Sequence, residues 1–231
     1  LMNLPEDYIP SAIDYKAVDA IDGFILHRYN ETVKKVTTLM DKYELGLAST
    51  YLYNFVYDDF CSFYIEMTKV SLNSEKYYKE GVYITLLKVL KAVVMMIYPF
   101  SPFITEEIYQ NLPNKKESIM LESYPEYDKK LVFKSCEEKG ETLNSIINAI
   151  RTYKVNNKLA PNAHVDIRIK CDKNIEELFD YINRFSFANS LEIVKNDVPN
   201  STSIVLSNLT IYILDNINKD ELKDNLMKDT C

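Results

Sequence analysis

The chain has 231 residues, a formal net charge of −7 and a pI of about 5.0, and apolar residues make up 47% of it. This apolar content is typical of a globular protein and excludes a disordered chain. With only 4 Gly, the chain has no glycine-rich phosphate-binding loop, and an all-β architecture is disfavoured. The acidic balance alone weakens a nucleic-acid-binding interpretation, because contacts to phosphates need Lys and Arg.

The cysteines and the apolar runs limit the compartment in which the protein works. Cys61, Cys136, Cys171 and Cys231 are widely spaced, which disfavours both a zinc site and a disulfide framework. No apolar run approaches the length that crosses a membrane, and no signal peptide opens the chain. We therefore expect reduced thiols, no metal, a cytoplasmic location and no membrane partner.

Hydrophobic periodicity predicts a series of helices in the first two thirds of the chain. The expected helices cover residues 18–41, 47–70, 73–98, 101–112 and 136–156. Ser101 and Pro102 mark the beginning of the fourth, since a capping residue stands before Pro at the first helical position. Residues 113–135, which carry Pro, Lys and Ser, are expected to form a long surface connection.

The pattern changes near Pro161. Residues 165–170 alternate with period two, which predicts a half-buried strand. The elements expected after it are a helix at 174–187, strands at 190–194, 203–206 and 209–214, and the start of a helix at 218–230. The patterns together predict a mainly α fold. Its parts are a helical bundle in residues 1–160, a small α/β domain in 161–215 and the start of a C-terminal helix in 216–231.

Residues 53–69 are dense in aromatic side chains and are crossed by one polar line. Its members stand four residues apart and would share one face of an α-helix: Asn54, Asp58, Ser62 and Glu66. A neighbouring row contains Tyr53, Tyr57, Phe60 and Tyr64. Such a pattern indicates a helix buried in a bundle, with one strip open to water or to a ligand. A plain core helix is the alternative on pattern alone.

The run Asp-Phe-Cys-Ser-Phe-Tyr-Ile-Glu at 59–66 closely resembles a signature of valyl-tRNA synthetases, Glu-Phe-Cys-Asp-Trp-Tyr-Leu-Glu, in their helical anticodon-binding domain. Residues 25–32, 99–112 and 147–161 are similar to three further segments of that family, in register over nearly the whole chain. The block at 99–112 is shared with isoleucyl and leucyl relatives, whereas the run around Cys61 points to valine.

The resemblance implies a C-terminal part that recognises the anticodon of valine tRNA, for ATP-dependent aminoacylation by the full-length enzyme. It also implies that the helix expected at 216–231 begins a coiled-coil arm. The class I catalytic signatures, similar to His-Ile-Gly-His and Lys-Met-Ser-Lys-Ser, do not occur in the chain. We therefore expect no catalytic residue and no cofactor here, with ATP and Mg²⁺ belonging to the parent enzyme. The expected partners are valine tRNA and the catalytic domain of the same chain, in a monomer. The alternatives are an isoleucyl or leucyl enzyme, or a helical protein-interaction module without RNA binding.

RNA loops are read by stacking splayed bases on aromatic rings and by hydrogen bonds to the base edges. The candidate tRNA-binding residues are Arg28, Asn54, Tyr57, Asp58, Asp59, Ser62, Glu66, Arg151 and Lys154. We expect at least two of Tyr53, Tyr57 and Tyr64 to pack inside the bundle. The two histidines, His27 and His164, are expected to be structural or surface residues and not catalytic bases.

Two of these assignments have competing interpretations. Asp59 falls off the polar line, and it either pairs with Arg28 or a lysine inside the bundle or accepts a hydrogen bond from the amino group of cytosine. Arg151, Lys154 and Lys158 have helical i, i+3, i+7 spacing and are expected to share a face. That face either meets tRNA phosphates or is solvated.

Overall fold

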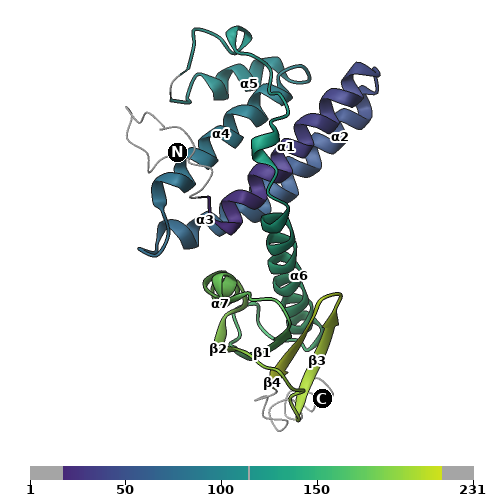
Figure 1. Cartoon of the computed structure of the whole chain (residues 1–231). Coiled ribbons are helices and arrows are strands. Elements are labelled where there is room, and N and C mark those ends of the chain that lie inside the picture. Colours follow the sequence, from purple (N-terminus) through teal and green to yellow (C-terminus); the bar gives the residue numbers. More distant parts are fainter. Residues whose placement is uncertain (1–17, 114, 215–231) are drawn as a thin grey trace, which may run out of the picture. The chain divides into compact units, whose positions relative to one another are not determined.

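The computed structural model describes residues 18–113 and 115–214 of the chain. The chain divides into two compact units between residues 140 and 141, within the helix α6 (Lys134–Asn156). The first unit is helical and the second contains a four-stranded sheet (Figure 1). The predicted mainly α fold, a helical bundle followed by a small α/β part, is confirmed.

The first unit is built from successive helices. They are α1 (Ala20–Asp41), α2 (Leu45–Asn54), the π-helical segment η1 (Phe55–Tyr64), α3 (Ile65–Leu72), α4 (Lys79–Ile97) and α5 (Pro102–Tyr109), with single 3₁₀ turns η2 (Ile119–Leu121) and η3 (Lys129–Leu131). Helix α1 lies beside α2 (Figure 1) and also contacts α4 and η1. No helix in the described ranges is both long and apolar enough to span a membrane.

Helix α1 forms where its stripe of apolar residues predicts it. The Asp19 carboxylate caps it by accepting hydrogen bonds from the backbone N–H groups of Ile21 and Asp22, at 2.9 and 2.7 Å. Such a cap satisfies donors that the first helical turn leaves without partners. Ile25 and Val36 on the stripe are fully buried. Helix α1 therefore packs through this stripe against its neighbours, α2, α4, η1 and η3.

The beginning of α4 differs from the prediction. The helix starts at Lys79, several residues after the beginning of the helix expected at 73–98. The Ser74 hydroxyl instead accepts from the backbone N–H of Lys76 at 3.2 Å, which closes a local turn. Serine competes for nearby backbone donors in this way, and it often forms turns for that reason.

The connection between α5 and α6 is anchored to the bundle. Ile119 in η2 is buried in a cluster with Val94, Tyr109 and Leu112. The Tyr109 hydroxyl donates a hydrogen bond to the Glu122 carboxylate at 2.6 Å. Parts of the predicted surface connection at 113–135 are thus packed, because their apolar residues fill the space beside α4 and α5.

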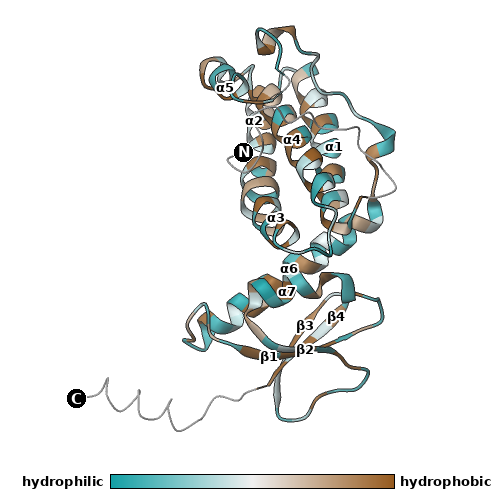
Figure 2. Cartoon of the chain, turned by 90° about the vertical axis from the view of Figure 1, so that its left-hand side faces the viewer, coloured by the Kyte–Doolittle hydropathy of each residue, from teal (hydrophilic) through white to brown (hydrophobic). Residues whose placement is uncertain are grey.

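The second unit has one sheet, with strand order β2-β1-β4-β3. Its strands are β1 (Val165–Cys171), β2 (Ala188–Ile193), β3 (Ser201–Leu206) and β4 (Leu209–Leu214), and the helix α7 (Phe179–Ser186) follows the 3₁₀ turn η4 (Glu176–Leu178). Strands β1 and β2 are parallel, so they need a crossover, and α7 provides it. The predicted alternation in β1 is confirmed, because Val165, Ile167 and Ile169 are buried on one face. Figure 2 shows α7 lying over the sheet.

The domain bounds expected from the sequence stay a prediction. In the structure, the second part of α6 belongs to the same compact unit as the sheet. The C-terminal arm expected at 216–231 lies outside the described residues.

Candidate nucleic-acid interface

The aromatic segment is a π-helix flanked by α-helices, a departure from the uninterrupted α-helix that its periodicity predicts. In a π-helix the backbone hydrogen bonds join residues i and i+5. Such segments are rare in proteins, and those that occur are often at functional sites. Phe55 and Phe60, five residues apart, are both 2% exposed. The buried side of the segment therefore follows the wider π-helical turn.

The polar line survives this change in geometry. Asn54, Asp58 and Ser62 are all exposed, whereas Glu66 is half-buried and its carboxylate pairs with Lys69 at 2.5 Å. Within the described part of the chain, the side chains of Asn54, Asp58 and Ser62 form no hydrogen bond or ion pair. Three of the four predicted polar positions thus present free polar groups on one surface.

Two tyrosines stand on the same exposed strip. Tyr53 and Tyr57 are 64% and 57% exposed, and their rings stack with centroids 5.7 Å apart and planes 5° from parallel. The expectation that at least two of the three tyrosines pack inside is wrong, because only Tyr64 is buried. The Tyr64 hydroxyl donates to the buried Asp22 carboxyl at 2.7 Å, a contact that fixes its ring in the core.

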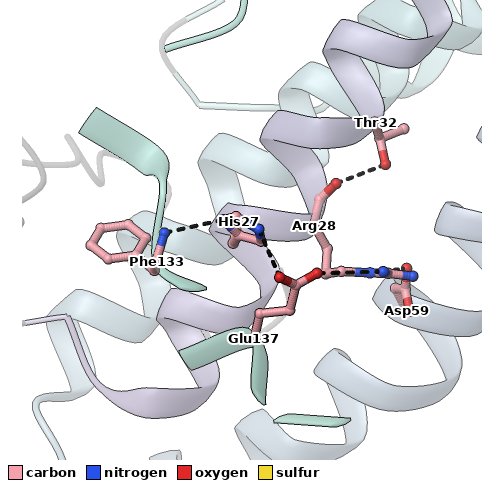
Figure 3. Close-up of polar contacts among 6 residues, drawn as sticks. All are labelled: His27, Arg28, Thr32, Asp59, Phe133 and Glu137. Atoms are coloured by element: carbon pink, nitrogen blue, oxygen red, sulfur yellow. Dashed lines mark hydrogen bonds and ion pairs between the residues drawn. The ribbon is translucent and has the colours of Figure 1, made fainter. Parts of the chain in front are cut away.

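Two further candidates, Arg28 and Asp59, form a polar network with Glu137 (Figure 3). Arg28 donates from Nε to Oδ2 of Asp59 at 3.1 Å, and its Nη1 lies 3.8 Å from Glu137 Oε1. Of the two interpretations of Asp59, the ion pair with Arg28 is confirmed. The carboxylate holds η1 against α1, since the side chain of Asp59 is only 20% exposed.

His27 belongs to the same network and is buried. Its Nδ1 accepts from the backbone N–H of Phe133 at 3.1 Å, so the proton of the neutral ring is on Nε2. Nε2 lies 3.0 Å from Glu137 Oε2 and donates to it. The prediction of a structural histidine is confirmed for His27, which joins α1 to the beginning of α6.

The basic face expected on α6 does not form. Arg151 is exposed, but Lys154 is 3% exposed. The Lys154 ammonium donates to the carbonyl oxygens of Pro161 and Ser186 at 3.2 and 2.8 Å, and burial lowers its pKa. Lys158 lies beyond the last residue of α6. The predicted sharing of one solvent face is wrong, because Lys154 turns inward to donate to these two carbonyl groups.

The same part of the second unit contains residues that the sequence analysis missed. A cavity there is lined by Arg184 and Phe187 together with Arg151. The chain has only four arginines, and this scarcity was the one sequence feature that could have drawn attention to Arg151 and Arg184. Nothing in the sequence, however, predicts that these two lie close together. Among the described residues, no group of three or more His, Cys, Asp or Glu side chains is arranged to hold a metal ion.

Comparison with known proteins agrees with the helical fold of the first unit. The family model described as the anticodon-binding domain of tRNA ligase matches residues 22–170. The chain belongs to this family.

The particular relatives are valine–tRNA ligases. The enzyme of Staphylococcus saprophyticus is 36% identical over 200 residues, which cover 84% of this chain and 23% of the relative. The enzyme of Staphylococcus aureus strain JH9 is 35% identical over 228 residues, which cover 94% of this chain and 26% of the relative. The chain thus spans about a quarter of the length of these relatives. The resemblance to the anticodon-binding part of valyl-tRNA synthetases is confirmed.

Proposed function

We propose that this chain is the tRNA-binding part of a valine–tRNA ligase and recognises the anticodon of valine tRNA. The observation that carries the proposal is the exposed, stacked pair Tyr53 and Tyr57 beside the free polar groups of Asn54 and Asp58. Stacking surface and edge-reading groups in one place are what recognition of a single-stranded RNA loop requires. The two valine–tRNA ligases at 36% and 35% identity support valine as the amino acid.

Asp58, and not Asp59, is proposed to read a base. A carboxylate accepts well from the exocyclic amine of cytosine, and valine anticodons end in adenine followed by cytosine. The Asp59 carboxylate is engaged with Arg28, whereas Asp58 is exposed and makes no ion pair with the described residues. Arg28 and Asp59 are then positioning residues, which hold the segment that carries the tyrosines.

Tyr57 and Tyr53 are proposed to supply the stacking surface. Base–aromatic stacking contributes about 1–3 kcal/mol per base. The two rings already lie parallel, so an added base continues the stack without reordering either side chain. Asn54 and Ser62, which both donate and accept, are proposed to complete the contacts to base edges.

The experiment that tests the proposal measures binding of the chain to valine tRNA and to the same tRNA with a changed anticodon. We expect Asp58→Asn and Tyr57→Ala to reduce the preference for the valine anticodon by about 1–3 kcal/mol each. Tyr78→Ala is the matched control, because Tyr78 is 58% exposed and lies at the start of α4. Unchanged anticodon preference in both folded variants would move the reading surface elsewhere.

The remaining features concern the parent enzyme. We propose that ATP and Mg²⁺ bind its catalytic domain, outside this chain, and that the protein is a cytoplasmic monomer. The same assay with isoleucine and leucine tRNAs tests the related enzymes, since tighter binding of either would replace valine in the proposal. Lack of binding to any tRNA would favour a protein-interaction module.

A further inference from the structure

The second unit contains a cavity at the carboxyl ends of α6 and α7. Its volume is about 420 Å³, within the range of ~300–1,000 Å³ that small-ligand pockets occupy. It is lined by Arg151, Lys154, Val155, Leu159, Pro161, Arg184, Phe185 and Phe187. The lining thus combines three cationic side chains with apolar and aromatic walls.

Two left-handed turns build the walls. Helix α6 ends in a turn in which the N–H of Leu159 bonds the carbonyl of Lys154 at 2.9 Å, with Lys158 at φ 53°. This turn folds Leu159 back toward the helix. Phe187 ends α7 at φ 50°, a left-handed conformation that often ends helices but is uncommon for a bulky residue.

Lys154 contacts the end of α7 beside Phe187. Its ammonium lies 5.2 Å from the centre of the Phe187 ring and donates to the Ser186 carbonyl at the end of α7. An ammonium has three donors, and its two bonds to Ser186 and Pro161 leave one for a ligand. Lys154 therefore supports the aromatic wall and brings one positive charge to the cavity lining.

The arginines point to an anionic ligand. The chain has four arginines. Arg28 pairs with Asp59, and Arg168 pairs with Glu192 at 3.0 Å. Within the described residues, Arg151 and Arg184 pair with no carboxylate. The two arginines without an anionic partner are thus both at this cavity, and the planar guanidinium is the side chain best suited to bind phosphate.

We propose that this cavity binds one unpaired nucleotide of an RNA, with its phosphate between Arg151 and Arg184 and its base against Phe185 and Phe187. The inference rests on the proposed function in taking RNA as the partner, but it concerns a different surface from the anticodon-reading segment. A base that leaves its stack exposes both an aromatic face and a charged backbone. A duplex offers only the backbone, so the aromatic walls select an unpaired nucleotide.

The first test titrates the whole chain with adenosine 5′-monophosphate, adenosine and inorganic phosphate, followed by the backbone amide NMR signals of residues 184–187. We expect the nucleotide to shift these signals at lower concentration than either of the other two probes. Arg184→Ala should weaken the nucleotide about fivefold or more. Lys195→Ala, which removes one exposed cation elsewhere in the unit, should leave it unchanged. Equal binding of phosphate and nucleotide, or equal effects of the two variants, would overturn the inference.

The second test separates this inference from the proposed function. Arg184→Ala should weaken valine tRNA and anticodon-changed tRNA by the same factor, about fivefold or more, whereas Asp58→Asn should change their ratio. If the parent chain discriminates anticodons but Arg184→Ala binds both tRNAs like the parent, the cavity inference fails and the proposed function stands. If Arg184→Ala weakens both tRNAs while the parent chain does not discriminate anticodons, the anticodon assignment fails and the cavity stands. A blunt RNA duplex that binds the cavity as tightly as a single strand of equal length would exclude the unpaired nucleotide.

Discussion

The Nε of Arg28 in α1 lies 3.1 Å from Oδ2 of Asp59 in the π-helical segment, and this ion pair joins the two elements at a partly buried position. The next residue, Asp58, is exposed and has no such partner among the described residues. Two adjacent carboxylates of the same type therefore have separate tasks, one in positioning the segment and one available to a ligand.

This division predicts that two neighbouring substitutions affect the free energy of unfolding by different amounts. Asp59→Ala should lower the free energy of unfolding by about 1–2 kcal/mol, because Arg28 then loses a charged hydrogen-bond partner at a site that water reaches only in part. Asp58→Ala should change it by less than about 0.5 kcal/mol. Urea unfolding of both variants measures the difference, and equal midpoints would contradict the assignment.

Asp22 should make the stability depend on pH. Burial, with the neighbouring Asp19 carboxylate, raises the pKa of Asp22 from 3.8 to about 8 against the opposing hydrogen bond from Tyr64. Between these values the folded protein holds a proton that the unfolded chain releases, so this group lowers stability as pH rises from about 4 to about 8. Each pKa unit corresponds to about 1.4 kcal/mol.

Asp22→Asn removes this titration while its amide oxygen still accepts from Tyr64. We expect the variant to unfold at a higher urea concentration than the parent at pH 8, with the advantage shrinking as the pH falls toward 5. Asp41→Asn, at the exposed end of α1, should show no such trend. A pH-independent difference between parent and Asp22→Asn would argue against a protonated Asp22 in the fold.

Two glycines in helices should respond in opposite directions to alanine. A Cβ at Gly140 would collide with the ring of Phe24, whereas a Cβ at Gly46 would meet nothing within 4 Å. Gly140→Ala should therefore destabilise the protein by about 1–3 kcal/mol through overpacking. Gly46→Ala should stabilise it by about 0.5–1 kcal/mol through helix propensity. Thermal melting of the two variants checks both signs, and a stabilising Gly140→Ala would show that Phe24 has room to move.

The sequence predicts local features well where the spacing of apolar residues within one element determines them. The stripe of α1 and the alternation of β1 are both found, because burial on one face dictates each of them. The exposed line from Asn54 to Ser62 also persists, since a four-residue step keeps these positions on one side of both helix types.

Features that depend on contacts between residues far apart in the chain cannot be predicted from local sequence patterns. The π-helical segment contains the buried Phe55 and Phe60 and packs against α1, an element distant from it in sequence. For Asp59 the sequence leaves open an ion pair inside the bundle or a hydrogen bond to a base. Helical spacing indicates which face Asp59 lies on, but it does not identify a partner 31 positions away. The inward direction of Lys154 depends on the Ser186 carbonyl, 32 positions along the chain.

Substitutions of Lys154 and Arg151 should consequently have different effects on stability and on tRNA affinity, although the sequence places both cations on one helix face. Lys154→Met leaves the carbonyls of Pro161 and Ser186 without their donor, so we expect a loss of about 1–3 kcal/mol in the free energy of unfolding. Arg151→Ala, at an exposed position, should change stability by less than about 0.5 kcal/mol. It should instead weaken all tRNAs alike and reduce the slope of log affinity against log salt by about 1.

Lys154→Arg, which retains the charge, separates the lost cation from the lost carbonyl contacts. Should Lys154→Met melt like the parent while lowering tRNA affinity as Arg151→Ala does, the ammonium would be a phosphate contact and not a support for the end of α7.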